Sequence, residues 1–406
     1  MCGIFGIVSH KKIDSKSLKA LAKHARQRGR DSSGLITHST DGYKTSRADF
    51  DINQLLGNVS IGNVSLCLGH SRLITNGSAD NQPVMRDDVI AIHNGIVVND
   101  DEIWDDLTVE RKFKIDSEII IGIALEHLKK NNNLSSIPTK IFEKCKGVVA
   151  CALLFPKLGK MLLFSNNGSL YTGTKDGSLL FSSESYPLIK LGCLKVTQVK
   201  GDAFIYDIPK EETMGTVKDH VINRLELVAP LSFNKEKEAL LEFNEPKLKR
   251  CTKCILPETM PFITFSNEGI CNYCTTYTPK NRPKPKEELF KLVEPYRRSG
   301  ETDCIVPFSG GRDSCYGLHL IVEELKMKPI TYTYDWGLVT DLGRRNISRM
   351  CSQLGVENII VAADLTKKRD NVARNLKAWM KSPHLGMMGI LTAGDKHFFR
   401  HVETVK

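Results

Sequence analysis

Apolar and polar positions divide the chain into regions with different periods. Up to about residue 205, short apolar runs are separated by polar turns, and helical spacing of apolar positions occurs near residues 15–27 and 116–130. Many short strands with a few amphipathic helices are typical of sheets that are covered by helices. We therefore predict an α+β sandwich, with its sheets between its helices, for residues 2–205.

The pattern changes after residue 205. Residues 206–250 lose the alternation and are predicted to form a connector, and residues 275–300 begin as a linker rich in Pro, Lys and Thr that leads into a short helix. In residues 301–406, apolar strands alternate with helical segments, which predicts an α/β domain with a parallel sheet and ligands at the carboxyl ends of its strands. The predicted strands are 304–308, 329–334 and 359–363.

Length and composition indicate a protein of two to three domains. The 406 residues exceed what one core normally organises, and 41% of them are hydrophobic. Val148–Phe155 is among the longest uncharged apolar runs, too short to span a membrane, and the N-terminal apolar patch lacks the basic start of a signal peptide. We expect a cytoplasmic protein with no membrane partner, whose 12 cysteines are reduced and serve chemistry, metal binding or packing.

Positive charge is concentrated in the second half of the chain. Residues 1–244 carry 31 basic and 29 acidic side chains, a net charge of +2, whereas residues 245–406 carry 26 and 18, a net charge of +8. This bias favours an anionic partner such as the phosphates of ATP or of a nucleotide-linked substrate. A basic surface that only confers solubility is the alternative. No basic stripe interleaved with aromatic residues supports nucleic acid as a partner.

Cysteine is the second residue, in the opening Met1-Cys2-Gly3-Ile4-Phe5. Removal of Met1 would leave a thiol and a free α-amine on one residue, and the amine can accept the thiol proton directly or through a water molecule. The alternative is a small residue that follows the initiator by chance. The sequence beyond this point distinguishes the two.

Four later segments supply what a cysteine that attacks a carboxamide needs. A polar loop surrounds Gly29, and Gly69-His70-Ser71-Arg72 ends an apolar run on an arginine that could hold a carboxylate. Asn94-Gly95 follows an apolar strand and offers an amide and an unhindered backbone N–H to an oxyanion. Asp116 precedes a helical pattern and could pair with an ammonium group. Together these groups suit glutamine, a free amino acid with an amide side chain.

On these motifs, the first half resembles the class II glutamine amidotransferase domain of the N-terminal-nucleophile type. The resemblance implies that Cys2 is the nucleophile and that Asn94 and Gly95 form the oxyanion hole. It implies further that Arg72 and Asp116 hold the two ends of glutamine, with His70 and Gly29 in the same binding set. Gln82-Pro83 and Ser183-Glu184 match supporting positions.

The residue after Asn94-Gly95 bears on the acceptor. Ile96 stands there, as in glucosamine-phosphate synthases, whereas the asparagine synthetase branch usually has Glu. This half of the chain therefore does not identify the acceptor.

Two CxxC pairs, separated by 16 residues, lie in residues 251–274. Each pair can direct two sulfurs at one point, and Zn²⁺ accepts four thiolates tetrahedrally. We predict a structural zinc site in this segment, which is too small to bury a core of its own. Disulfides, an iron–sulfur cluster or unligated thiols are the alternatives. The predicted ligands are Cys251, Cys254, Cys271 and Cys274.

An apolar strand runs directly into Ser309-Gly310-Gly311-Arg312-Asp313-Ser314, and a helical pattern follows from Tyr316. Strand, glycine loop and helix are the geometry of phosphate binding, because backbone N–H groups and serine hydroxyls point at one anion. Asp313 is expected to cap the helix or to reach Mg²⁺. The loop differs from the Walker pattern. It resembles the PP-loop of ATP pyrophosphatases, which implies ATP binding by Ser309, Gly310, Gly311, Asp313, Ser314 and Lys396.

Residues 251–399 resemble the N-acetyl sugar amidotransferases of surface polysaccharide assembly. The resemblance implies transfer of ammonia from glutamine to an acceptor that ATP activates as an adenylate, an N-acetylated and nucleotide-linked sugar. Only about a hundred residues follow the loop, fewer than related PP-loop domains carry, so we expect a pared-down or incomplete domain or a partner subunit that completes it. Amidation of a carboxylate as in asparagine synthetase, a tRNA-modifying ligase and a non-catalytic nucleotide sensor are the alternatives.

Overall fold

The computed structural model describes most of the chain in two compact units. The first unit comprises Met1–Asn223, Tyr296–Ala363 and Phe398–Lys406, and the second comprises Arg224–Pro295 and Asp364–His397. The predicted connector 206–250 lies largely outside the described residues, and Lys396 lies wholly outside them. The described residues are 2–10, 12–40, 42–62, 64–73, 80–131, 133–208, 247–280, 283–337, 339–381, 402, 403 and 405.

Two antiparallel sheets form the body of the first unit. The larger sheet has the order β11-β9-β10-β1-β4-β2-β3 and the smaller has the order β12-β8-β7-β6-β5. The strands of the larger sheet are β1 (Gly3–Val8), β2 (Ser32–Ser39), β3 (Gly42–Ala48), β4 (Leu66–Arg72), β9 (Tyr171–Lys175), β10 (Ser178–Ser182) and β11 (Leu194–Gln198). Those of the smaller sheet are β5 (Val84–Arg86), β6 (Val89–Val97), β7 (Gly147–Phe155), β8 (Lys160–Ser165) and β12 (Phe204–Asp207).

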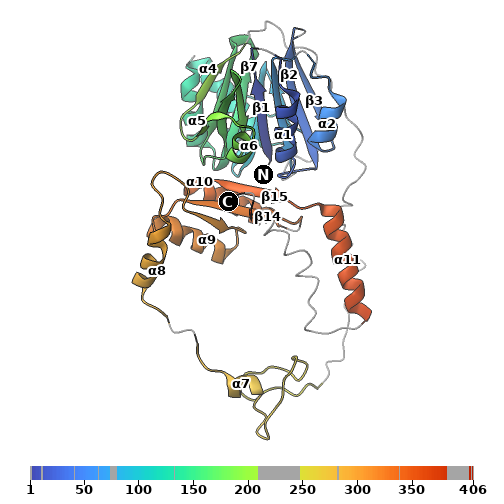
Figure 1. Ribbon diagram of the computed structural model, residues 1–406, viewed down its shortest axis with the longest axis vertical. Helices are drawn as coiled ribbons and strands as arrows, with labels where there is room; N and C mark the ends of the chain where they lie inside the picture. Colours follow the sequence, from blue (N-terminus) through green and yellow to red (C-terminus); the bar gives the residue numbers. More distant parts are fainter. Residues whose placement is uncertain are drawn as a thin grey trace. The chain divides into compact units, whose positions relative to one another are not determined.

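Helices cover the outer faces of both sheets (Figure 1). Leu18 and Ile52 pack α1 and α2 against the larger sheet, and Ile119 and Ile141 pack α4 and α5 against the smaller one. A third apolar core fills the space between the two sheets. The predicted αββα sandwich is therefore confirmed. Its helices are α1 (Ser15–Ala25), α2 (Ile52–Asn58), α3 (Asp100–Asp106), α4 (Ser117–Lys130), α5 (Ile137–Lys144) and α6 (Ser185–Lys190).

Glycines in the central strands allow aromatic rings to lie flat against the backbone. A Cβ atom on Gly69 would lie 2.2 Å from the ring of Phe5, and one on Gly6 would lie 2.3 Å from the ring of Phe181. Both rings are fully buried. The two glycines therefore fix how closely helices and sheets can pack around β1, the strand that follows Cys2.

A three-stranded parallel sheet belongs to the same unit. Its order is β13-β14-β15, as the alternation of strands and helices predicts. Val306, Phe308 and Ile347 form one core together with Leu73 and Val148 of the sandwich. We call these strands and their helices the docked layer. It consists of β13 (Cys304–Pro307), α9 (Arg312–His319), a π-helical turn (Leu320–Glu324), β14 (Pro329–Asp335), α10 (Asp341–Gln353) and β15 (Asn358–Ala362).

The second unit contains the CxxC segment and three described helices. They are α7 (Asn272–Thr276), α8 (Lys286–Val293) and α11 (Leu365–Lys381). Ile255 and Phe262 of the CxxC segment are exposed, at 68% and 89%. This segment therefore has little apolar core to hold its shape.

None of the helices in the described part of the chain combines the length and the apolar character that a membrane crossing requires.

Candidate functional site

Cys2 lies at the start of β1 with only 5% of its surface exposed. Its Sγ is 3.8 Å from the backbone oxygen of Leu73, the residue that follows β4. Burial raises the pKa of the Cys2 thiol, the charge of Arg72 lowers it in part, and the charge of Asp116 raises it. The thiol therefore needs a nearby base before it can act as a nucleophile.

Arg28 holds the main chain of Cys2. Its Nε donates to the Cys2 carbonyl at 3.0 Å, and its Nη1 lies 2.7 Å from Oε1 of Glu184. Arg28 is 1% exposed, so this ion pair is out of water. A Cβ atom on the next residue, Gly29, would lie 2.2 Å from the carbonyl carbon of Arg72, which explains why only glycine fits there.

The Glu184 carboxylate is shared by two basic side chains. Its Oε2 lies 2.8 Å from Nε2 of His24, and its Oε1 receives Arg28. Burial alone would raise the pKa of Glu184, but the hydrogen bond from His24 and the charge of Arg28 lower it to about 2. The sequence singled out Glu184 as a supporting position but gave no reason to single out Arg28 or His24.

Arg72 and His70 stand on β4 and are buried. Arg72 donates from Nη1 to the backbone oxygen of Asp80. Burial and then the charge of Arg72 lower the pKa of His70 well below its usual range, so the His70 ring is neutral. Within the described part of the chain, neither ring nitrogen of His70 has a hydrogen-bond partner of ordinary geometry. The strand thus places a buried positive charge close enough to act on Cys2.

Asn94 and Gly95 are consecutive residues of β6. The Nδ2 atom of Asn94 lies 3.4 Å from Oγ of Ser183, and its Oδ1 has no hydrogen-bond partner among the residues that the structure describes. The same Ser183 hydroxyl accepts a hydrogen bond from the backbone of Ile4 at 2.9 Å, which brings Asn94 close to the strand of Cys2. A Cβ atom on Gly95 would lie 1.9 Å from the Val148 oxygen, so β6 and β7 approach there only because residue 95 is glycine.

Asp116 precedes α4 and is 3% exposed. Its Oδ2 accepts from the backbone N–H of Val97 at 2.9 Å, and Ser117 Oγ lies 3.4 Å from its Oδ1. No lysine or arginine among the described residues forms an ion pair with Asp116. The carboxylate is therefore buried without a cation of its own, as a site for an ammonium group would require.

A hydrogen-bond network behind β6 joins Gln82, His93 and Ser117. Gln82 Nε2 donates to Ser117 Oγ at 2.9 Å, and Gln82 Oε1 accepts from the backbone of His93 at 2.6 Å. Burial lowers the pKa of His93, whose Nε2 lies 3.2 Å from the Val148 oxygen. The network fixes His93, the residue before the Asn94-Gly95 segment.

Glu118 orders the loop that leads into α4, a contribution that the sequence did not indicate. It is fully buried, pairs with Arg86 Nη1 at 2.7 Å, and accepts backbone N–H groups of Lys112 and Phe113 at 2.8–3.1 Å. A buried acid in a helix-forming run gives no signal of its partners in the sequence.

The loop Ser309–Ser314 follows β13 and leads into α9. Gly310 has φ +74° and approaches α10 so closely that a Cβ atom there would lie 2.6 Å from the Gly343 oxygen. The hydroxyls of Ser309 and Ser314 lie 3.1 Å apart. Gly311, not Asp313, is the N-cap residue, and α9 begins at Arg312, before the helical pattern that the sequence shows from Tyr316.

Asp313 does not cap α9 because it lies inside the first turn, with its side chain 94% exposed. The expectation that Asp313 caps the helix is therefore wrong. Its exposed carboxylate remains compatible with Mg²⁺ binding, which stays a prediction. Lys396, predicted at the same site, lies outside the described residues.

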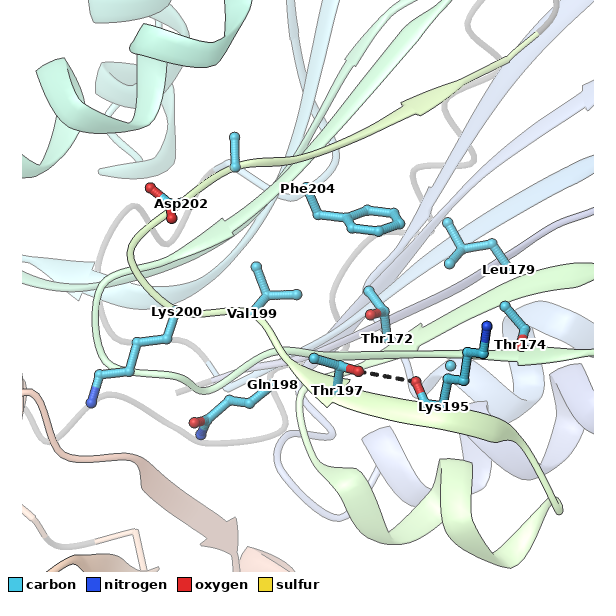
Figure 2. A pocket seen from close by; sticks show the side chains of 12 residues that line it. Thr172, Thr174, Leu179, Lys195, Thr197, Gln198, Val199, Lys200, Asp202 and Phe204 are labelled. Carbon is cyan, nitrogen blue, oxygen red and sulfur yellow. Dashed lines mark hydrogen bonds between the residues drawn. The ribbon is translucent and has the colours of Figure 1, made fainter. Parts of the chain in front are cut away.

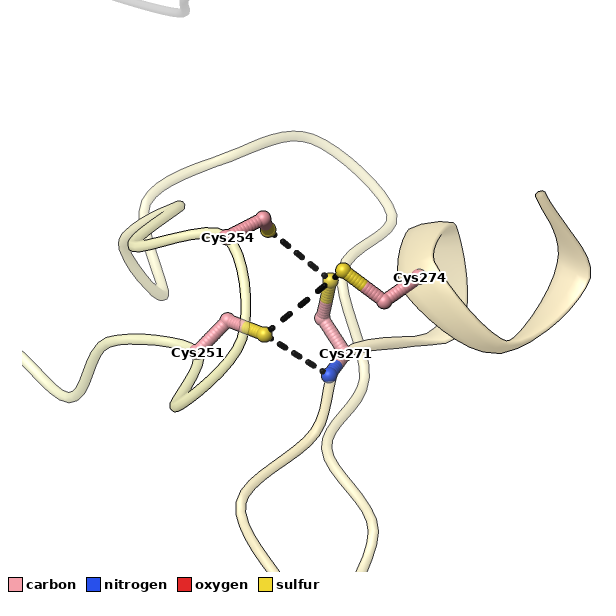
Figure 3. A group of neighbouring side chains, drawn as sticks. All are labelled: Cys251, Cys254, Cys271 and Cys274. Carbon is pink, nitrogen blue, oxygen red and sulfur yellow. Dashed lines mark hydrogen bonds between the residues drawn. The ribbon is translucent and has the colours of Figure 1, made fainter.

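The four predicted ligand cysteines meet in one cluster (Figure 3). Their sulfurs all lie within 4.8 Å of one another, with Cys251–Cys274 at 3.9 Å and Cys254–Cys271 at 3.5 Å. Four sulfurs bound to one zinc ion stand ~3.8 Å apart, at the corners of a tetrahedron with ~2.3 Å bonds. The four-cysteine cluster therefore fits a metal ion such as zinc.

Backbone N–H groups point at the sulfur of Cys251. Those of Lys253 and Cys271 lie 3.4 and 3.2 Å from it. Burial would raise the pKa of Cys251, but hydrogen bonds from Cys254, Cys271 and Lys253 lower it to about 6. The thiolate of Cys251, the form that binds metal, is thus favoured at neutral pH, whereas the hydrogen bond with Cys254 raises the pKa of Cys274 to about 12.

A separate cavity of about 400 Å³ lies beside β9, β11 and β12 (Figure 2). Thr172, Val199 and Phe204 line it, with Lys195 and Lys200 among its charged residues. The described lining residues include neither a thiol nor an imidazole. The cavity does not belong to the site around Cys2.

Residues 70–190 match the family model of a glutamine amidotransferase domain. Glutamine–fructose-6-phosphate aminotransferase (isomerizing) from Rhizobium meliloti is 26% identical over 196 residues, which are 46% of this chain and 32% of that protein. The enzymes of the same name from Rhizobium leguminosarum bv. viciae and Thermococcus kodakarensis are 29% and 27% identical over 197 residues, 46% and 45% of this chain and 32% of each relative. The match thus spans about a third of the length of these relatives.

Among solved structures, glutamine phosphoribosylpyrophosphate amidotransferase from B. subtilis, complexed with ADP and GMP, shows a weak likeness. It has 17% sequence identity and a TM-score of 0.41, covering 51% of this chain and 47% of that one. This likeness is too weak to carry a conclusion. The family match and the relatives do carry one: the N-terminal part of the chain contains a glutamine amidotransferase domain.

We predict that Glu184→Gln lowers stability near neutral pH by about 3 kcal/mol, because it breaks the buried pair with Arg28. The pKa of the Glu184 carboxyl is about 2 in the folded chain against an ordinary 4.5, so its contribution is full above pH 4.5 and is lost as pH falls towards 2. Urea unfolding of both proteins between pH 2 and pH 7 measures the difference.

The difference between Glu184→Gln and the wild type should therefore shrink as the solution becomes acidic. Glu143→Gln, at an exposed pair with Lys140, is the control and should change stability by less than ~0.5 kcal/mol. An equal loss at every pH would contradict the assignment of the shifted pKa to Glu184.

Proposed function

We propose that this chain is a glutamine-dependent amidotransferase in which Cys2 releases ammonia from glutamine for transfer to an acceptor that ATP activates. The observation that carries the proposal is the gathering of Cys2, Arg72, Asn94 and Asp116 at one buried place in a glutamine amidotransferase domain. Four segments far apart in sequence converge there.

The first step is attack of the Cys2 sulfur on the glutamine carboxamide. After removal of Met1, the α-amine of Cys2 takes the thiol proton, which overcomes the raised pKa that burial imposes. The carbonyl of Cys2 is held by Arg28 at 3.0 Å, so the residue that carries both nucleophile and base has a fixed main chain.

Asn94 and Gly95 stabilise the oxyanion that forms. The oxygen and the nitrogen of the Asn94 amide can be exchanged without changing the shape of the side chain. When the oxygen faces the Ser183 hydroxyl, the NH₂ group is the end without a partner among the described residues. That donor and the Gly95 N–H then face developing negative charge, which is the condition for oxyanion stabilisation.

Arg72 and Asp116 bind the two ends of the amino acid. The Arg72 guanidinium pairs with the α-carboxylate and the Asp116 carboxylate with the α-ammonium. Both side chains are buried, so they would meet the charged ends of glutamine largely out of water, where an ion pair is stronger.

Ammonia leaves when the tetrahedral intermediate collapses, with the proton from the α-amine, and a thioester remains on Cys2. Water then adds to the thioester, glutamate departs, and the thiol is restored. His70 and Gly29 complete the binding set, Gly29 through its tight packing on the Arg72 backbone.

The docked layer is proposed to activate the acceptor. The Ser309–Ser314 loop, with its two hydroxyls and the N-terminus of α9, binds the phosphates of ATP. Lys396 stays a candidate ATP-binding residue on the sequence alone. An oxygen of the acceptor attacks the α-phosphate and pyrophosphate leaves, after which ammonia displaces AMP. Asp313 is the candidate ligand for Mg²⁺, which would neutralise phosphate charge.

The acceptor we propose is an N-acetylated, nucleotide-linked sugar whose acetamido oxygen is adenylated. The four-cysteine cluster is proposed to hold structural Zn²⁺ through its four thiolates. We propose one task for each predicted segment. Residues 2–205 release ammonia, residues 251–274 fold around the metal, and residues 301–406 carry out adenylation.

Replacing the nucleophile tests the glutaminase. Cys2→Ala should lower glutamine hydrolysis at least ~10³-fold while ammonia-dependent product formation persists. Cys193→Ala, a thiol outside the site, should keep full activity. Hydrolysis that survives in Cys2→Ala, or full activity in a protein whose intact mass still includes Met1, would refute the role of Cys2.

Metal content tests the cluster. The wild-type chain, purified under reducing conditions, should carry one zinc ion, whereas Cys254→Ser should lose it and unfold the CxxC segment. Cys315→Ser is the control and should retain the metal. Atomic emission measures the metal content and limited proteolysis measures the unfolding. An iron chromophore in the wild type would show that the cysteines hold an iron–sulfur cluster and not zinc.

Product analysis tests the acceptor half. With glutamine, ATP and a panel of acylated sugars, we expect pyrophosphate and a product that has gained nitrogen. Ser314→Ala should reduce pyrophosphate release ~10-fold or more without affecting glutamine hydrolysis, whereas Ser299→Ala should affect neither. Formation of ADP, or an aminated carboxylate as the product, would contradict the proposal of an adenylated sugar. It would not affect the proposal that Cys2 hydrolyses glutamine.

A further inference from the structure

Helix α10 of the docked layer inserts a side chain into the sandwich beside the oxyanion segment. Ser348 is fully buried, its Oγ donates to the Ile96 oxygen at 2.8 Å, and it accepts from the Val148 N–H at 2.8 Å. Ile96 and Val148 are opposite residues of β6 and β7. The hydroxyl therefore bridges two backbone groups of paired strands, one residue beyond Gly95.

The sandwich is shaped to receive this hydroxyl. Gly147 has φ +116°, and a Cβ atom there would lie 3.0 Å from Ser348 Oγ and 2.1 Å from the Ile96 oxygen. Without Ser348, two buried backbone groups would lose a hydrogen-bond partner, and an unsatisfied polar group is costly inside a protein. The end of β6 is thus held in place by a residue of the docked layer, outside the sandwich.

The nucleophile is held from the same direction. Arg28, which binds the Cys2 carbonyl, also donates from Nη2 to the Asn358 oxygen of β15 at 3.2 Å. The neighbouring Gln27 oxygen accepts from the Ala362 N–H at 3.0 Å. One guanidinium therefore connects the main chain of Cys2 to the docked layer.

The third contact is apolar. Leu73, whose carbonyl faces the Cys2 thiol, packs in one core with Phe308 and Ile347 of the docked layer. Arg28 beside the nucleophile, the oxyanion strand β6 and the residue after Arg72 thus each contact the docked layer.

We infer that Ser348 and Arg28 are positioning residues of the glutaminase, through which the docked layer sets the geometry of β6 and Cys2. The inference rests on the proposed role of Cys2. Both residues act through the backbone of β6 and of Cys2. Because reacting groups must be held within about 0.5 Å of their productive positions, a small shift at either contact is enough to slow the reaction.

The same helix offers a matched control. Ser352 lies one turn after Ser348 and receives a hydrogen bond from Asn166 Nδ2 at 3.1 Å. It belongs to the same interface, but Asn166 follows β8 and binds the backbone of β7, at Gly147 and Val149, and not that of the oxyanion strand β6. A merely structural role predicts similar effects for the two serines, whereas a positioning role does not.

The experiment compares Ser348→Ala and Ser352→Ala in the full chain, by steady-state glutamine hydrolysis and thermal unfolding. Ser348→Ala should lower kcat about 10- to 100-fold with KM changed less than about twofold. Ser352→Ala should stay within about twofold of the wild type in both constants. Equal kcat values for the two variants in an active enzyme would overturn the inference.

A second variant covers failure of Ser348→Ala to fold. Arg28→Lys keeps the charge beside Glu184 but cannot make three contacts in one plane, and it should lower kcat about tenfold or more with KM nearly unchanged. A kcat equal to that of the wild type would count against the inference. A wild-type chain that hydrolyses no glutamine would overturn the proposed function, and this inference with it.

Discussion

The guanidinium of Arg28 joins three parts of the molecule that the sequence keeps far apart. It binds the carbonyl of Cys2, the carboxylate of Glu184 and the carbonyl of Asn358, at 3.0, 2.7 and 3.2 Å. A buried charge is costly unless every donor is used, and this one is paired with an acid that His24 also binds. The environment of Cys2 therefore depends on a pair that tolerates little rearrangement.

Around this pair, the strands of the sandwich hold most of the functional groups rigidly, and the residue before α4 adds a carboxylate. The strands β1, β4 and β6 are buried along their whole length and place Cys2, Arg72 and Asn94 on well-packed elements. Asp116 comes from the residue before α4, where the Val97 N–H holds its carboxylate. Functional groups on strands keep their geometry better than groups on loops, which suits a reaction that requires a fixed oxyanion.

Much of the fold and of the four-cysteine cluster could be predicted from the sequence, because both depend on local sequence patterns. Strand and helix periods gave the αββα order, and CxxC spacing gave the four sulfurs that meet in the structure. The contacts of Arg28 with Glu184 and Asn358 span 156 and 330 residues, and no local pattern records such a distance. Ser348 likewise looks like an ordinary polar position of an amphipathic helix.

At Asp313, a local sequence pattern led to a wrong prediction. A carboxylate just before a helical pattern favours an N-cap, but the glycine loop turns earlier, so α9 starts at Arg312 and Gly311 takes the cap position. Gly310, with a φ of +74° that favours glycine, turns the chain there and so decides where the helix begins.

The order of synthesis gives the bridge made by Ser348 a further meaning. Ribosomes release the N-terminal sandwich long before α10 and β15, and domains generally fold in the order in which they emerge. If the later segments tighten the site as inferred, the Cys2 thiol of a nascent chain is held less firmly until α10 and β15 have been synthesised. Premature glutamine breakdown would then be avoided by timing alone.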